Sequence, residues 1–201
     1  MDNATVDGNT FTTPACFPVR GEDSFTDADF TPLGTHVPEV GGGWTALLDG
    51  GAEIRNNNVK KGSAAGDALW NINGSLCDET YWVRLQVKLR DTAATTCAGP
   101  AGRIQDENNL YWAKLCGDGV LRLELISGAT PTVLGTYTVP SFDPYTMYNI
   151  KLRLGNANKK VILDGTEVIN SSDNTIAGTG VAGLRLTDNI SRGDDFKAQD
   201  F

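Results

Sequence analysis

The chain has 201 residues, 23 glycines, four cysteines, one histidine and a formal net charge of −8 at pH 7. This length fits one domain, and 40% hydrophobic residues with 21% charged residues exclude wholesale disorder. The acidic balance argues against nucleic acid as a partner, and a lone histidine, His36, excludes metal sites built from several histidines.

Residues 1–22 are rich in Thr and Asn, contain Pro14 and Pro18, and show no periodic pattern. We expect them to form an arm that is extended or disordered unless a partner binds it. The N-terminus as written lacks the basic and apolar regions of a secretory signal peptide. No apolar run in the chain is long enough to span a membrane. These features indicate a cytosolic protein, a protein whose upstream signal is missing, or a protein released by cell lysis.

From Asp23 onward the main signal is a period of two, which is typical of half-buried β-strands. It is clearest in Tyr81–Arg90, where apolar residues alternate with polar residues and one tryptophan, and it recurs in Val120–Ile126 and Tyr148–Leu154. Shorter strands are expected at Trp44–Leu48, Ala52–Ile54, Ala68–Ile72, Leu110–Leu115, Val133–Val139, Lys160–Leu163, Glu167–Ile169, Val181–Leu186 and Asp195–Ala198.

Glycine-containing turns separate these strands. Asp164-Gly165 is the strongest hairpin signal, because a type I′ turn needs positive φ at both central residues. Gly117-Asp118-Gly119 predicts another turn. No window of the sequence carries a helical stripe, so the pattern predicts an all-β sandwich or barrel of antiparallel strands.

The four cysteines are Cys16, Cys77, Cys97 and Cys116, and they show no spacing typical of a zinc site. If Asp106–Asn109 form a hairpin turn, the residue opposite Cys116 is about Gly99, and Cys97 then lies close to Cys116. A disulfide between these two is one interpretation. Because nothing in the sequence indicates export, we favour four separate thiols.

Several segments together resemble the concanavalin A-like lectin/glucanase jelly rolls, which include laminin G-like modules. The resemblance rests on GRIQDENNLYWA at 102–113, YNIKLRLGNANKKVILDGTEV at 148–168, GVAGL at 180–184, DDFKA at 194–198 and Asp23-Ser24-Phe25 as an opening strand. It covers residues 23–201 and implies a β-sandwich of two stacked antiparallel sheets, one concave and one convex, following the arm at 1–22. It also implies that the opening strand pairs with the closing strand.

The sequence lacks the catalytic patterns of this family. The laminarinase-type members carry an E-x-D-x-x-E strand and the jelly-roll lyases a His and a Tyr near Arg and Gln, and neither pattern is present. Glu124 is the only acid on a clearly polar strand face, and its basic neighbours favour an ion pair. His36 lies in a turn-like stretch, so we expect it at the surface or at a strand edge. We therefore predict a protein that is not an enzyme.

The best ligand-binding candidates are Trp82, Arg84 and Gln86, on the polar side of the long strand. An aromatic face beside polar groups can stack on a sugar ring and bind its hydroxyls. Trp112 and Lys114 lie on a neighbouring strand and are expected to extend the same platform. The alternative is that the second sheet or a loop covers Trp82.

The resemblance also implies a structural Ca²⁺ between the opening and closing strands. Asp23 and Asp195 match the positions where those strands supply oxygens to the ion. The alternative is a solvated acidic edge.

From these features we predict a non-enzymatic structural or decoration protein of a phage virion, in the capsid or tail. Residues 1–22 would bind other virion subunits, the protein would be a homo-oligomer on the virion surface, and it would contact cell-surface glycans but neither nucleic acid nor membrane. The alternative is a secreted, extracellular carbohydrate-binding module or degenerate glycosidase of a polysaccharide-degrading system. A third interpretation is an active glycosidase with relocated acids.

Overall fold

The computed structural model of the chain describes residues 3–6, 9–12, 19–74 and 79–201. Within these ranges the regular structure is β-strand, apart from one short 3-10 helix, η1 (Leu33–Thr35). No helix in this part of the chain is long and apolar enough to cross a membrane. The prediction of an all-β fold is confirmed.

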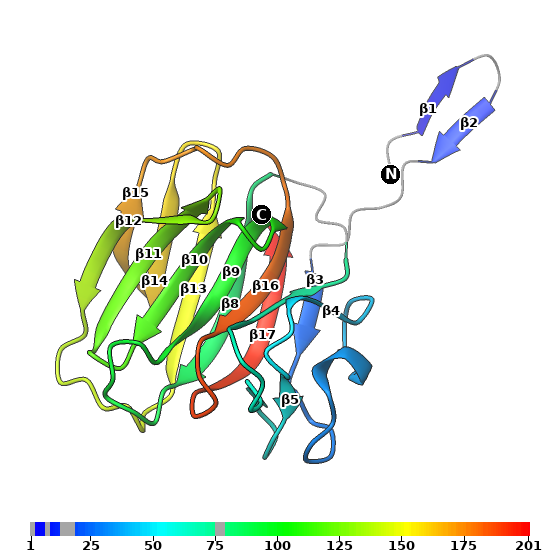
Figure 1. Cartoon of the computed structure of the whole chain (residues 1–201). Coiled ribbons are helices and arrows are strands. Elements are labelled where there is room, and N and C mark those ends of the chain that lie inside the picture. The colour runs from blue at the N-terminus through cyan, green and yellow to red at the C-terminus, as the bar shows by residue number, and fades with distance from the viewer. Residues whose placement is uncertain (1–2, 7–8, 13–18, 75–78) are drawn as a thin grey trace.

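Two antiparallel sheets stack face to face (Figure 1). The seven-stranded sheet has the order β12 (Thr130–Thr138), β11 (Val120–Ser127), β10 (Asn109–Cys116), β9 (Cys97–Asp106), β16 (Val181–Leu186), β7 (Ala68–Ile72) and β4 (Trp44–Leu48). The eight-stranded sheet has the order β15 (Thr166–Ser171), β14 (Lys159–Leu163), β13 (Tyr148–Leu154), β8 (Tyr81–Lys88), β17 (Arg192–Asp200), β6 (Val59–Lys60) and β5 (Glu53–Ile54), with β3 (Val19–Asp23) paired to β17.

The core fills the space between the sheets, and the period of two creates it. Along β8 and β13 every second side chain is buried, and Val83, Leu85, Ile150 and Leu152 are fully enclosed. The bounds expected for β4, β7, β13 and β16 agree with the structure. The hairpin at Asp164-Gly165 is also confirmed, since both residues have positive φ.

Strand β9 lies in the middle of the seven-stranded sheet, and the period of two did not indicate it, although a hairpin at Asp106–Asn109 implies a strand before the turn. Its sequence, CAGPAGRIQD, is rich in small residues and does not alternate, because both of its faces are buried. Its glycines are required by close packing. A Cβ atom at Gly99 would collide with the carbonyl oxygen of Ala113, and one at Gly102 with the side chain of Leu154.

The sandwich begins earlier than predicted. Strand β3 starts at Val19, inside the segment expected as an arm, and pairs with the closing strand β17, with Asp23 opposite Phe196. The expected pairing of the opening and closing strands is confirmed. Further toward the N-terminus, β1 (Asn3–Val6) and β2 (Asn9–Thr12) pair with each other in a small sheet, in a segment for which an extended or disordered arm was expected.

Candidate functional site

The predicted binding residues lie on two different outer faces. Trp82, Arg84 and Gln86 alternate with core residues of β8 and project from the eight-stranded sheet. Trp112 alternates with core residues of β10 and belongs to a separate apolar cluster on the outside of the seven-stranded sheet. Lys114 shares its side of β10. The expectation of a single platform is therefore wrong, because alternation tells which residues point outward but not which sheet a strand joins.

On the eight-stranded sheet, the predicted polar groups bind one another. Arg84 Nη2 lies 2.6 Å from Asp195 Oδ1, and Gln86 Nε2 donates to Asp195 Oδ2 at 2.8 Å. Lys151 Nζ lies 4.5 Å from the centre of the Trp82 ring. This outer face is thus occupied by its own ion pairs and a cation–π contact.

The predicted calcium residues do not share a site. Asp195 is engaged by Arg84 and Gln86 on the outer face. Asp23 is enclosed, and its carboxylate accepts hydrogen bonds from Trp44 Nε1 at 2.5 Å and from the backbone N–H of Phe25 at 2.7 Å. Within the described ranges no group of three or more His, Cys, Asp or Glu side chains converges. These residues do not fit a calcium ion, which needs six to eight oxygens.

His36 is buried, contrary to the expectation of a surface residue. Its Nε2 lies 2.8 Å from Asp23 Oδ1 and its Nδ1 lies 2.8 Å from Asp27 Oδ2. Burial alone would lower the pKa of His36, but the hydrogen bonds and charges of Asp27 and Asp23 outweigh it and raise the pKa. Burial raises the pKa of Asp23 despite its hydrogen bonds.

The outer face of the seven-stranded sheet contains a hollow of about 300 Å³, which we call the Trp112 hollow. Its lining combines apolar, cationic and anionic side chains from five strands (β4, β10, β11, β12 and β16) and from the β9–β10 and β11–β12 turns. They are Leu48, Glu107, Asn108, Trp112, Lys114, Glu124, Ile126, Ala129, Pro131 and Arg185.

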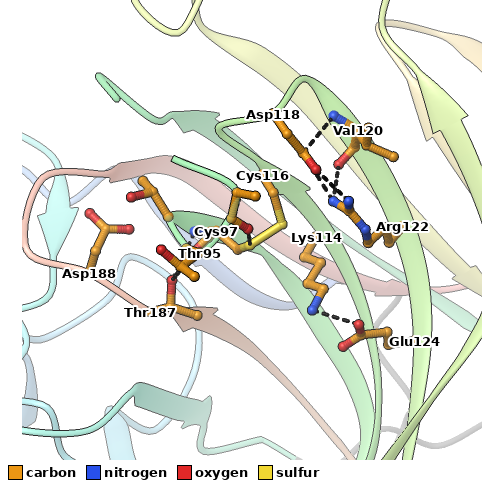
Figure 2. Close-up of a disulfide and its surroundings, with 12 residues drawn as sticks. Thr95, Cys97, Lys114, Cys116, Asp118, Val120, Arg122, Glu124, Thr187 and Asp188 are labelled. Atoms are coloured by element: carbon orange, nitrogen blue, oxygen red, sulfur yellow. Dashed lines mark hydrogen bonds and ion pairs between the residues drawn. A yellow bond between two sulfur atoms is a disulfide. The ribbon is translucent and has the colours of Figure 1, made fainter. Parts of the chain in front are cut away.

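Charged side chains are fixed around the indole of Trp112. Lys114 Nζ and Arg185 Cζ each lie 4.8 Å from the centre of the ring. Lys114 also pairs with Glu124 at 2.6 Å, as Figure 2 shows. Arg185 pairs with Asp67, with Nη2 at 2.6 Å from Oδ2. The predicted ion pairing of Glu124 is confirmed.

Two donors of the Trp112 hollow lack an acceptor. Trp112 Nε1 and Arg185 Nη1 are buried and have no hydrogen-bond partner among the described residues. A buried donor without a partner costs free energy that a ligand acceptor can recover. The lining of the hollow therefore includes two residues with an enclosed, unsatisfied donor, together with Glu124, whose carboxylate can act as an acceptor.

A disulfide crosses the same outer face. Cys97 and Cys116 are joined by an S–S bond beside Lys114 (Figure 2), so the preference for separate thiols is wrong for this pair. The register of β9 and β10 shifts by two residues between Asn109 and Tyr111, which places Cys97 opposite Cys116 where the hairpin count had placed Gly99. Cys16 and Cys77 lie outside the described residues.

Neither a protein-family model nor a curated protein matches the sequence. Among solved structures, the carbohydrate-binding module CBM66 from Bacillus subtilis is 18% identical, with a TM-score of 0.67 over 78% of this chain and 95% of that one. The GH43 protein BlXynB from Bacillus licheniformis is 11% identical, with a TM-score of 0.65 over 96% of this chain and 42% of that one. The binding domain of botulinum neurotoxin serotype D is 12% identical, with a TM-score of 0.61 over 91% of this chain and 48% of that one.

The fold is a concanavalin A-like jelly roll. The chain matches nearly the whole of CBM66 but spans less than half of BlXynB and of the neurotoxin domain.

Sequence reasoning missed part of the lining of the Trp112 hollow. Arg185 was not selected, although it alternates with the buried Leu184 and Leu186 in β16, which marks it as an outward residue. Only the pairing of β16 with β9 brings it close to Trp112. Leu48 ends a short strand in which apolar and polar residues do not alternate, so no local signal identified it as part of the lining.

Proposed function

We propose that this jelly roll binds carbohydrate in the Trp112 hollow without cleaving it. The observation that carries the proposal is the lining of one hollow, which combines apolar side chains, two residues with an unsatisfied buried donor and a carboxylate held by an ion pair. Sugar rings present apolar C–H faces edged by hydroxyl groups, so they suit a site that combines apolar surface with a few placed polar groups. The similarity of fold to CBM66, of which 95% is covered, supports this proposal.

The non-enzymatic part of the proposal rests on the acids of the Trp112 hollow. Glycoside hydrolysis uses a pair of carboxyl groups on either side of the scissile bond, one of which must donate a proton. Glu124 is engaged in an ion pair with Lys114 at 2.6 Å, and Glu107 is the other carboxyl group in the lining. Incubation with β-glucans, xylans and fructans should release no reducing sugar. Release that disappears in Glu124→Gln would overturn this part.

The binding test compares two glutamates that are both paired with lysine on outer faces. Glu124 pairs with Lys114 at 2.6 Å in the Trp112 hollow, and Glu167 pairs with Lys160 at 2.7 Å on the eight-stranded sheet. On a panel of neutral polysaccharides, Glu124→Gln should weaken binding about tenfold, because a charge-assisted hydrogen bond to a hydroxyl is lost. Glu167→Gln should bind like the unsubstituted protein. Equal binding by both variants contradicts the proposal.

The role in a phage virion stays a prediction, as do the partner subunits, the homo-oligomer and the location on a virion surface or in the extracellular space. A carbohydrate-binding module, which is part of the alternative from the sequence, is at least as well supported by the solved structures of similar fold. Deletion of residues 2–20 followed by a particle-incorporation assay tests the virion role, since anchoring by this segment requires incorporation to fail.

A further inference from the structure

A second hollow, of about 200 Å³, lies at the end of the sandwich where β8 finishes and β17 begins, toward the bottom of Figure 1. We call it the basic hollow. Its lining contains three cationic side chains, two amides and a phenol, and no carboxylate: Lys88, Arg90, Arg192, Asn56, Asn58 and Tyr145. This composition contrasts with the net charge of −8 of the chain.

Strand pairing forces these cations together. Lys88 and Arg192 are direct partners in the β8–β17 register. Arg90 follows two residues after Lys88, and its backbone N–H donates to Pro144 O at 2.7 Å. Like charges directly opposite each other on antiparallel strands destabilise a sheet. Burial lowers the pKa of Arg192, and the charges of Arg90 and Arg55 lower it further.

The nearby acids Asp188 and Glu53 influence Arg192 through their charges but form no ion pair with it. Asp188 accepts from the backbone N–H groups of Ile190 and Ser191 at 2.7 and 2.8 Å. Glu53 pairs with Lys60 at 3.2 Å. No described acid comes within ion-pair distance of Lys88 or Arg90. Among the described residues, no carboxylate forms an ion pair with the three cations of the basic hollow.

One of the cations is fixed in position. Arg192 Nη1 donates to the carbonyl oxygens of Ile190 at 2.6 Å and Ser191 at 3.0 Å, which holds the guanidinium group in place. A guanidinium group presents several N–H donors in one plane and binds carboxylate, sulfate or phosphate oxygens two at a time. The ammonium of Lys88 and the amides of Asn56 and Asn58 add further donors around the same space.

We propose that the basic hollow binds an oxyanion group carried by a polysaccharide, a sulfate ester or a carboxylate. The site is separate from the Trp112 hollow and extends the proposed carbohydrate binding to charged glycans. A bound oxyanion neutralises the repulsion between Lys88, Arg90 and Arg192, so binding should also stabilise the fold.

The test uses dextran sulfate against neutral dextran, which share a backbone. Arg90→Gln and Arg153→Gln are matched variants, because both arginines are exposed and only Arg90 lines the basic hollow. Arg90→Gln should weaken binding of dextran sulfate about tenfold and reduce its salt dependence, whereas Arg153→Gln should change it less than about twofold. Equal losses in the two variants, or no loss in Arg90→Gln, would overturn the proposal.

Further probes identify the bound group. Inorganic sulfate should raise the melting temperature of the unsubstituted protein more than that of Arg90→Gln, and alginate tests whether a carboxylate suffices in place of a sulfate ester. A DNA oligonucleotide that binds as tightly as dextran sulfate would overturn the proposal in favour of unspecific attraction of polyanions. If neutral glycans do not bind while Arg90→Gln still weakens dextran sulfate binding, only the proposed function of the Trp112 hollow fails.

Discussion

Cys97 and Cys116 are direct partners across β9 and β10, with their Cα atoms 4.1 Å apart and a disulfide between them. The bond joins the central strand β9 to its neighbour on the outer face that also contains the Trp112 hollow. The two cysteines are 19 residues apart in the sequence, so the disulfide closes a short loop in the unfolded chain.

Removal of this disulfide should lower the free energy of unfolding by about 3 kcal/mol, the value for a loop of roughly this length. The double variant Cys97→Ala/Cys116→Ala isolates the effect, because a reducing agent would also act on any other disulfide. Urea unfolding measures the change. A loss below about 1 kcal/mol would contradict a stabilising role for the disulfide.

His36 should make stability fall as pH rises above neutrality. Its pKa is raised in the folded state, so the stabilisation is complete below the unfolded pKa of about 6.5 and is lost as pH rises through the folded pKa. Because the chain has one histidine, a single imidazole NMR signal reports the titration. Asp27→Asn should lower that pKa, since it removes one of the two flanking carboxylates. An unchanged titration in this variant would refute the pairing.

A buried lysine should have the opposite dependence on pH. Lys159 is fully enclosed beside Arg103, and its Nζ donates to Gly155 O at 2.9 Å and Asn174 Oδ1 at 3.0 Å. Burial lowers its pKa to about 8, and the charge of Arg103 contributes further. The unfolded state therefore binds more protons than the folded state between pH 8 and 10.5, and stability rises across this window.

Comparison with Lys159→Met isolates this effect. Between pH 7 and 9.5 the free energy of unfolding of the unsubstituted protein should rise by about 2 kcal/mol relative to that of the variant. The size follows because each unit of pKa difference between the folded and unfolded states corresponds to roughly 1.4 kcal/mol. Lys160→Met is the control, because Lys160 is only half-buried and pairs with Glu167. Urea unfolding at the two pH values gives both differences. If the free energy of unfolding changes equally with pH in all three proteins, the pKa of Lys159 is not lowered in the folded state.

Trp82→Ala should leave neutral-glycan binding within about twofold of the unsubstituted protein. The Trp82 ring already contacts Lys151, and Arg84 and Gln86 are bound to Asp195. Retention on the polysaccharide panel used for Glu124→Gln measures the effect. A tenfold loss would instead locate the binding platform on the eight-stranded sheet, as the sequence predicted for Trp82.

The sequence predicts strands well where one face of the strand is buried and the other is exposed to solvent. Alternation located β13 residue by residue. It failed for β9, where both faces are covered and Gly99 and Gly102 leave room for neighbouring atoms. A strand enclosed on both sides has no period of two to recognise.

The candidate site was predictable only in part, because local sequence patterns do not show which distant strands pair or in which register. Alternation identified Trp82 and Trp112 as outward residues but could not assign them to different sheets. The register shift after Asn109 decided which residue lies opposite Cys116. The burial of His36 depends on Asp23, in a strand that pairs with the far C-terminal strand β17.

The position of the last two strands has a consequence for biosynthesis. Strand β16 lies between β9 and β7, and β17 lies between β8 and β6 while also pairing with β3, so both sheets are completed by residues 181–200. A nascent chain that lacks this segment exposes unpaired strand edges in the middle of each sheet. The sandwich therefore closes only after residues 181–200 have been synthesised, and its folding is dominated by long-range contacts.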